Sequence, residues 1–152
     1  MTKKKTPFLE RDYTYNEKYN LYFPILEILV GSKEYKKKIS ALADTGCTSC
    51  IHLCKSFVEK EKLVLGKKIN KEPIPFSVAD GHTINGDFYE IICEIDGKEE
   101  KVIVSVIDPE KFFKEEEPQI ETVEPLLGRG ILDKFDVLFK GKERKIALSH
   151  PE

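Results

Sequence analysis

Residues 42–50, LADTGCTSC, place an aspartate, a threonine, a glycine and two cysteines directly after an apolar run. The apolar run predicts a strand that ends at Asp44, and Gly46 permits a tight turn behind it. Three interpretations are open at this point: a catalytic carboxylate, cysteine ligands of a metal, or a polar turn in which Asp44 caps its own loop. The spacing alone favours the turn.

Length and charge set the broad class. The chain has 152 residues, which is enough for one domain with a sizeable core, and its 25 basic and 27 acidic residues give a formal net charge of -2. No apolar run approaches the roughly 20 residues of a membrane span, and the Lys-rich start is not followed by the apolar stretch of a signal peptide. We expect an intracellular, cytoplasmic protein with no nucleic-acid or membrane partner.

The hydrophobic pattern predicts a mainly β domain. A hairpin over residues 21–42 leads into Asp44, and one short amphipathic helix is expected between Leu53 and Leu65. Two further hairpins are predicted around Asp80-Gly81 and Asp96-Gly97, because an Asp-Gly pair between alternating apolar residues favours a tight turn. A short helical turn after residue 130 and two strands around Gly141 complete the pattern.

Two segments lack this pattern. Residues 1–20 are polar and Tyr-rich without clear periodicity, which predicts a flexible N-terminal arm ahead of a domain over residues 21–152. Residues 109–124 are rich in glutamate and contain two prolines, which predicts an acidic insertion.

The four cysteines offer a second kind of site. Three of them crowd together as Cys47, Cys50 and Cys54, a poor disulfide framework, so reduced and buried thiols are the expectation. The alternative is a zinc site completed by Cys93 or His52, in which case the chain is a zinc-binding interaction module.

Two stretches resemble the signatures of one protein family. ALADTGCTS, at residues 41–49, resembles the active-site loop of the retropepsin-like aspartic proteases. About 80 residues later, PLLGRGIL resembles that family's second signature, with Leu127, Gly128 and Arg129 at its centre and Gly130 where Asp or Asn is common. CTSCIHLCKSFV and SVADGHTI are similar to stretches of the proteases of caulimovirus-type plant pararetroviruses.

The resemblance implies a fold and a set of roles. The fold would be the closed β-barrel of the acid proteases with one or two short helices, and Asp44 would be catalytic. Thr45 and Gly46 would support the active-site loop, and Arg129 would brace the dimer interface. Residues 77–90 would form a flap over the substrate, with its tip at Ala79, Asp80, Gly81 and His82. No metal or organic cofactor is implied.

The chemistry adds a requirement for a second copy. Hydrolysis by this route needs two carboxylates that share one proton, because carboxylates about 3 Å apart cannot both ionise. The chain has a single Asp-Thr-Gly, so the second Asp44 must come from another copy of the chain across a two-fold axis. The predicted function is therefore that of a homodimeric aspartic endopeptidase acting on extended polypeptide, such as a viral polyprotein in the host cytoplasm. The alternative within the same family is a catalytically silent module for peptide binding or dimerisation.

Overall fold

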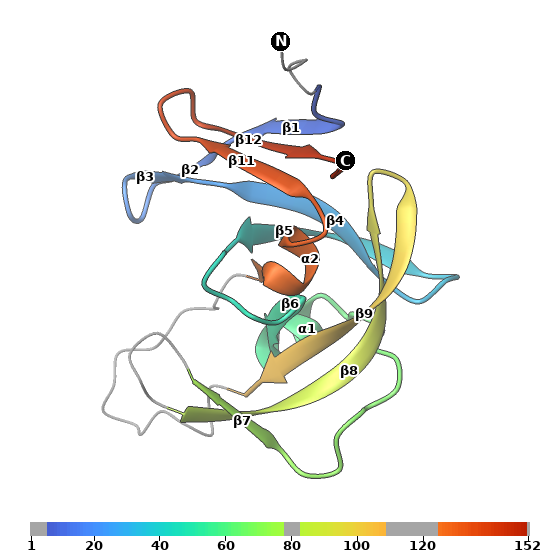
Figure 1. Cartoon of the computed structure of the whole chain (residues 1–152). Coiled ribbons are helices and arrows are strands. Elements are labelled where there is room, and N and C mark those ends of the chain that lie inside the picture. Colours follow the sequence, from blue (N-terminus) through green and yellow to red (C-terminus); the bar gives the residue numbers. More distant parts are fainter. Residues whose placement is uncertain (1–5, 78–82, 109–124, 152) are drawn as a thin grey trace.

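Six strands close into a barrel in the computed structural model, which describes residues 6–77, 83–108 and 125–151 (Figure 1). Each strand pairs with the next, and the last pairs with the first between Leu29–Gly31 and Ile92–Glu94. In order around the barrel, the strands are β4 (Ile25–Gly31), β5 (Lys36–Ala43), β10 (Leu126–Leu127), β6 (Ile51–Cys54), β9 (Lys98–Ile107) and β8 (Thr83–Ile95). The predicted closed β-barrel is confirmed.

The core fills the inside of this barrel and continues beyond it to residues nearer the C-terminus, such as Ile131, Ile146 and Leu148. Alternate side chains of β4 and β5 are buried, as a period of two requires when one face of a strand meets the core. Each fully buried aliphatic side chain contributes about 1.5–3 kcal/mol through the hydrophobic effect. The largest fully buried apolar side chains are Leu26, Ile28, Val30, Ile51, Leu53, Val104, Leu127, Ile131, Ile146 and Leu148.

The Asp96-Gly97 turn has the geometry that its sequence predicts. It joins β8 to β9, and both central residues have positive φ, 52° at Asp96 and 77° at Gly97. Two positive φ angles are typical of the type I′ turn, whose twist matches that of the strands it connects. The sequence prediction of this hairpin is confirmed.

Strand β7 (Ile74–Ser77) extends the sheet beyond the barrel by pairing with the first part of β8. This pair forms the base of the hairpin predicted at residues 77–90. The predicted tip residues Ala79 to His82 lie outside the described residues, and so does the predicted insertion at residues 109–124.

The first helix is shorter than predicted. Helix α1 spans Lys55–Lys60, because Leu53 and Cys54 belong to β6 and pair with β9. Lys62 has a φ of 52°, a left-handed conformation that ends helical structure, and Leu63 then turns back into the core. Helix α2 spans Arg129–Leu132, with Ile131 and Leu132 buried. Among the described residues, no helix has the length and apolar character needed to cross a membrane.

A second sheet lies beside the barrel and includes residues expected to be flexible. β1 (Leu9–Asp12) pairs with β12 (Lys145–Ser149), which pairs on its other side with β11 (Asp136–Lys140). A small hairpin of β2 (Thr14–Asn16) and β3 (Leu21–Phe23) follows. The first 20 residues therefore contain strands where the sequence analysis expected a flexible arm, because the partner of β1 lies more than 130 residues away and leaves no local pattern.

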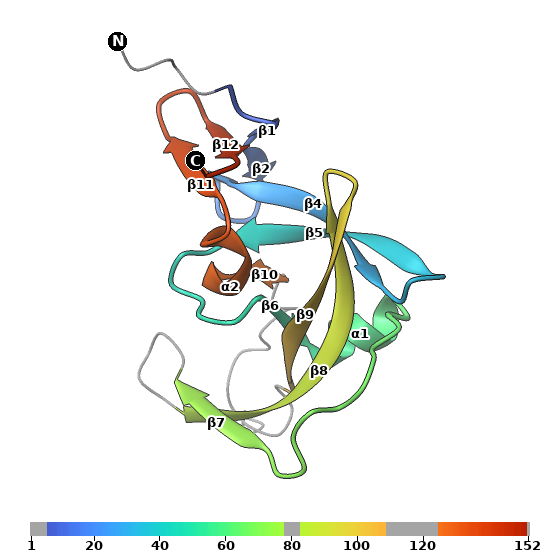
Figure 2. The ribbon, with the colours of Figure 1, turned by 45° about the vertical axis from the view of Figure 1, so that its right-hand side comes forward.

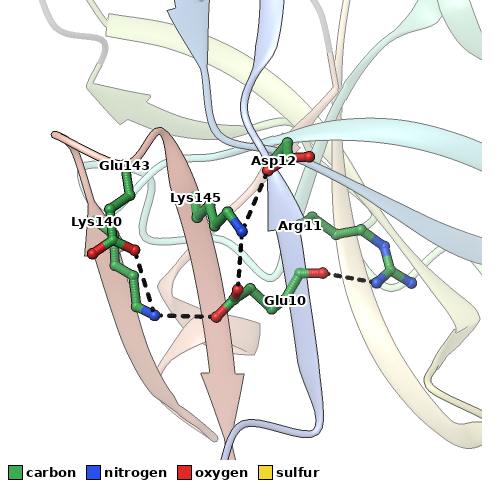
Figure 3. Close-up of polar contacts among 6 residues, drawn as sticks. All are labelled: Glu10, Arg11, Asp12, Lys140, Glu143 and Lys145. Atoms are coloured by element: carbon green, nitrogen blue, oxygen red, sulfur yellow. Dashed lines mark hydrogen bonds and ion pairs between the residues drawn. The ribbon is translucent and has the colours of Figure 1, made fainter.

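Ion pairs tie the three strands of this sheet together (Figure 3). Glu10 on β1 accepts from Lys140 on β11 at 3.1 Å and lies 3.5 Å from Lys145 on β12. Lys145 also reaches Asp12, and Lys140 reaches Glu143, both at 3.9 Å. The hydrogen bond from Lys140 lowers the pKa of Glu10. Exposed ion pairs contribute little stability one by one, and these contacts join β1 to both strands of the C-terminal hairpin, whose register with β1 is given by backbone pairing.

Candidate active site

Asp44 follows β5 directly and is held by backbone contacts on both sides. Its N–H donates to the carbonyl oxygen of Leu127 at 3.0 Å, and its carbonyl oxygen accepts from the N–H of Cys47 at 3.2 Å. Carboxylate oxygen Oδ1 accepts from the N–H of Gly46 at 2.8 Å, which is an Asx-turn. The local geometry is therefore that of a polar turn. The same hydrogen bond from Gly46 also fixes the direction of the half-buried Asp44 carboxylate.

The two sequence signatures lie side by side although about 80 residues separate them. β10 lies between β5 and β6, with Leu127 opposite Ala43 on one side and Ile51 on the other. The loop between β5 and β6, residues 44–50, therefore begins and ends next to the same short strand, β10, which pairs with both β5 and β6. Figure 2 shows this loop beside helix α2, which follows β10 at once.

Three consecutive backbone N–H groups after β10 donate hydrogen bonds to carbonyl oxygens of the loop. The N–H of Gly128 donates to Cys50 O at 2.9 Å, and that of Arg129 donates to Cys47 O at 2.7 Å. The N–H of Gly130 donates to Ser49 O at 3.3 Å. Carbonyl groups that point inward from the loop are thereby satisfied, which a stable polar loop requires. Backbone hydrogen bonds from residues 128–130 therefore fix the loop, and the loop's own sequence carries no signal for them.

Gly128 and Gly130 allow this close approach. A Cβ atom at Gly128 would lie 2.0 Å from Ser49 O, and one at Gly130 would lie 2.5 Å from Cys50 Sγ. Packing explains why residue 130 is a glycine, because Cys50 occupies the space that a side chain there would need.

Arg129 lies at the start of α2 with its side chain exposed. Its Nε is 3.5 Å from Asp133 Oδ2, in an ion pair whose side chains are 55% and 65% exposed. An exposed pair of this kind contributes little to stability. Arg129 is therefore placed on the surface next to the Asp44 loop, and its predicted bracing of a dimer interface stays a prediction.

A solved structure matches this arrangement. The EIAV protease complexed with the inhibitor HBY-793 superposes with a TM-score of 0.53 at 20% sequence identity. The match covers 79% of this chain and 91% of that chain. The chain has a retropepsin-like fold. No protein-family model matches the chain, and no curated protein matches it.

Within the retropepsin-like fold, the predicted support residues occupy different surroundings. Thr45 and Gly46 are exposed at the outer turn of the loop, whereas Leu127 and Gly128 are buried beneath it. Thr45 is therefore accessible to another molecule, whereas Leu127 supports the loop from the core side by accepting the hydrogen bond of Asp44 N–H. The roles assigned to these residues from the family resemblance stay predictions.

The cysteines are all free thiols. Cys54 and Cys93 are buried, while Cys47 and Cys50 are half-buried within the loop of residues 44–50. Burial raises the pKa of Cys47, and it raises the pKa of Cys93 to about 12. Among the described residues, no three His, Cys, Asp or Glu side chains gather as a metal-binding group.

A buried chain of polar side chains behind the loop was not predicted from the sequence. Parallel pairing of β6 with β9 sets His52 opposite Ser105, and His52 Nδ1 lies 2.8 Å from Ser105 Oγ. Ser105 Oγ donates to Ser49 Oγ at 2.9 Å, so the chain of contacts ends in the loop that carries Asp44. His52 and Ser105 are 7% and 0% exposed, and burial lowers the pKa of His52. The sequence analysis considered His52 only as a metal ligand, because the pairing with Ser105 depends on strand register.

A cavity of about 360 Å³ lies on another part of the molecule. It opens between the end of the β8–β9 hairpin, α2 and the terminal sheet, and residues 44–50 contribute nothing to its lining. Its walls include Phe8, Cys93, Ile95, Phe135 and His150. It is therefore separate from the loop that carries Asp44.

Proposed function

We propose that this chain is an aspartic endopeptidase of the retropepsin type. The observation that carries the proposal is the Asp44 loop: a half-buried carboxylate at a strand end, oriented by Gly46 and clamped by the Leu127–Gly130 segment. A catalytic carboxylate must keep its direction through the reaction, and backbone contacts provide this at little cost in side-chain entropy. The match to the EIAV protease supports the fold that the mechanism requires.

The reaction needs two copies of Asp44. One carboxylate, unprotonated, takes a proton from a water molecule whose oxygen attacks the peptide carbonyl carbon. The other, protonated, gives its proton to the carbonyl oxygen, which yields a tetrahedral diol. Collapse of the diol breaks the C–N bond as the amine nitrogen takes the proton that the first carboxyl received. A hydroxyl group of the diol returns a proton to the second carboxylate, which leaves a carboxylic acid, an amine and the starting pair. Because the chain has one Asp-Thr-Gly, the active form is a homodimer with the two loops facing each other.

The proposed substrate is an extended polypeptide. Strand β7 and the start of β8 project from the barrel as a pair of strands, which suits a peptide bound as an added strand. The resemblance to the caulimovirus-type proteases suggests a viral polyprotein, processed in the cytoplasm of the host cell. No metal or organic cofactor takes part in this mechanism.

Replacement of Asp44 tests the proposal. The Asp44→Asn variant and the unchanged protein are incubated at pH 5 with a denatured protein, and new N-termini are identified by mass spectrometry. The matched control is Asp96→Asn in the β8–β9 turn, since asparagine tolerates the positive φ of that residue. We expect cleavage by the unchanged protein and by Asp96→Asn, and none by Asp44→Asn.

Equal cleavage by all three proteins would exclude the enzymatic proposal. Binding of the denatured substrate without cleavage by any of them would instead favour the alternative, a silent peptide-binding module. Circular dichroism of each variant excludes loss of folding as the cause of lost activity.

A further inference from the structure

Ser49 joins the loop of residues 44–50 to the surrounding strands through both its backbone and its side chain. Its carbonyl oxygen accepts from the N–H of Gly130 at 3.3 Å, on the side of β10 and α2. Its Oγ lies 2.9 Å from Oγ of Ser105 on β9, the strand that flanks β6 on the other side. The end of the loop nearest β6 is thus held from both sides of that strand.

Ser49 also contacts the part of the loop next to Asp44. Burial raises the pKa of the Cys47 thiol, and hydrogen bonds from the backbone and the side chain of Ser49 act against this rise. The N–H of Cys47 in turn donates to the carbonyl oxygen of Asp44 at 3.2 Å. Ser49 therefore links the wall of the barrel to the turn that holds the Asp44 carboxylate.

The direction of the hydrogen bonds follows from the single hydrogen of the Ser105 hydroxyl. That hydrogen is donated to Ser49 Oγ at 2.9 Å, and the alternative acceptor is the carbonyl oxygen of Ile51 at 3.4 Å. Both acceptors lie on residues 49–51, so Ser105 has no hydrogen left to donate to His52. His52 Nδ1, at 2.8 Å, is therefore the donor, and the proton of the neutral imidazole is on Nδ1.

The pair of His52 and Ser105 is unusual for its place in the core. Ser105 is fully buried and His52 nearly so, next to aliphatic residues such as Leu53 and Val104. Among the described residues, no buried side-chain nitrogen or oxygen lacks a hydrogen-bond partner. An apolar pair of the same shape could be as stable, because it would avoid the cost of desolvation. What an apolar pair could not provide is a hydrogen bond to Ser49.

We propose that His52 and Ser105 are positioning residues for the Asp44 loop. His52 Nδ1–H donates to Ser105, and Ser105 donates to Ser49. Ser49 then keeps the second half of the loop in the arrangement that orients the Asp44 carboxylate. Because His52 and Ser105 are both buried, they act through Ser49 and not by contact with a substrate.

This inference rests on the proposed function, in which the direction of the Asp44 carboxylate decides the rate of the chemical step. A reacting group that is displaced by a fraction of an ångström slows the reaction while the rest of the cleft still binds substrate. Loss of the His52–Ser105–Ser49 network should therefore act on kcat more than on KM.

Hydrogen–deuterium exchange of the full chain tests the support of the loop without any need for activity. In Ser105→Ala and in His52→Leu, the peptide that contains residues 44–50 should exchange roughly two- to tenfold faster, as expected for the loss of one hydrogen bond. His52→Asn should exchange as the unchanged protein does, because an asparagine amide supplies an N–H donor near the position of Nδ1. A peptide from β4 is the internal reference and should not change.

Val102→Ala is the matched control for lowered stability. Val102 is a buried residue of β9 that pairs with Ile91 on β8, and its side chain has no hydrogen bond to lose. The substitution leaves a cavity, but exchange of the loop should stay unchanged. Ser49→Ala cuts the network at its half-buried end, and the double variant with Ser105→Ala should exchange no faster than the faster single variant.

Kinetics with one cleaved peptide separate positioning from general support of the fold. In Ser105→Ala and His52→Leu, kcat should fall at least about tenfold while KM changes by less than about twofold. His52→Asn should keep kcat within about twofold, and so should Val102→Ala at a temperature where it is fully folded.

The proposal would be overturned by unchanged loop exchange and kcat in both Ser105→Ala and His52→Leu. It would also be overturned by losses of the same size in Val102→Ala, which would indicate general destabilisation. Equal losses in His52→Asn and His52→Leu would exclude donation from Nδ1.

These outcomes are separate from those of the proposed function. Faster exchange of the loop in Ser105→Ala, combined with equal cleavage by Asp44→Asn and the unchanged protein, would keep the support of the loop and exclude the aspartic mechanism. Cleavage that depends on Asp44, combined with normal kcat in both Ser105→Ala and His52→Leu, would keep the mechanism and exclude positioning by this network.

Discussion

The Cα of Gly128 lies so close to the carbonyl oxygen of Ser49 that a Cβ atom at residue 128 would be 2.0 Å from that oxygen. This contact joins the second signature to the loop of Asp44, and both contacting atoms belong to ordered backbone. Neither can move aside without loss of the hydrogen bonds from Gly128 and Arg129 to the loop.

We therefore expect Gly128→Ala to be strongly destabilising. The loss should be about 3 kcal/mol, the upper end of the range for overpacked sites, because the clash is with backbone. Urea unfolding followed by fluorescence or circular dichroism measures it. Gly141→Ala is the matched control, since nothing lies within 4 Å of its Cβ position, and it should change stability by less than about 0.5 kcal/mol. Similar stabilities for both variants would contradict the close approach.

The buried thiol of Cys93 should resist alkylation in the folded protein. Its pKa of about 12 leaves about one thiol in 10⁴ as thiolate at pH 8, and its side chain is 2% exposed. Iodoacetamide labelling followed by peptide mass spectrometry should show Cys93 modified only after denaturation, with Cys47 and Cys50 modified earlier. Rapid labelling of Cys93 in the native protein would show that the barrel opens easily there.

Peptide cleavage should have its optimum at acidic to near-neutral pH. The two Asp44 carboxylates of a dimer share one proton, and activity is lost when that proton leaves at high pH. Initial rates measured with one peptide substrate between pH 4 and pH 9 give the profile. Undiminished activity at pH 9 would count against a carboxylate pair, whatever the fold.

The features that the sequence predicts best are those with local signals. The Asp96-Gly97 hairpin depends on two adjacent residues and is confirmed, whereas the catalytic role of Asp44 rests on the resemblance at residues 41–49 and 125–132 and stays a prediction. β1 was missed because its strand character comes from pairing with β12 at the other end of the chain. The contact of His52 with Ser105 was missed for the same reason, since a register shift of one residue would separate them.

Protonation of His52 should weaken the fold as the pH falls. The unfolded histidine, with the ordinary pKa of 6.5, takes up a proton below that pH, whereas burial lowers the pKa of the folded one. The unfolded state then binds more protons, so the contribution of His52 is fully present above pH 6.5 and is lost below it. The slope contributed by one proton is at most about 1.4 kcal/mol per pH unit. Urea unfolding at pH 7, 6 and 5 should show a flatter dependence for His52→Gln, which keeps a polar group for Ser105 but cannot titrate. An equal pH dependence of stability in both proteins would contradict the lowered pKa, because it would mean that His52 has the same pKa in the folded and unfolded states.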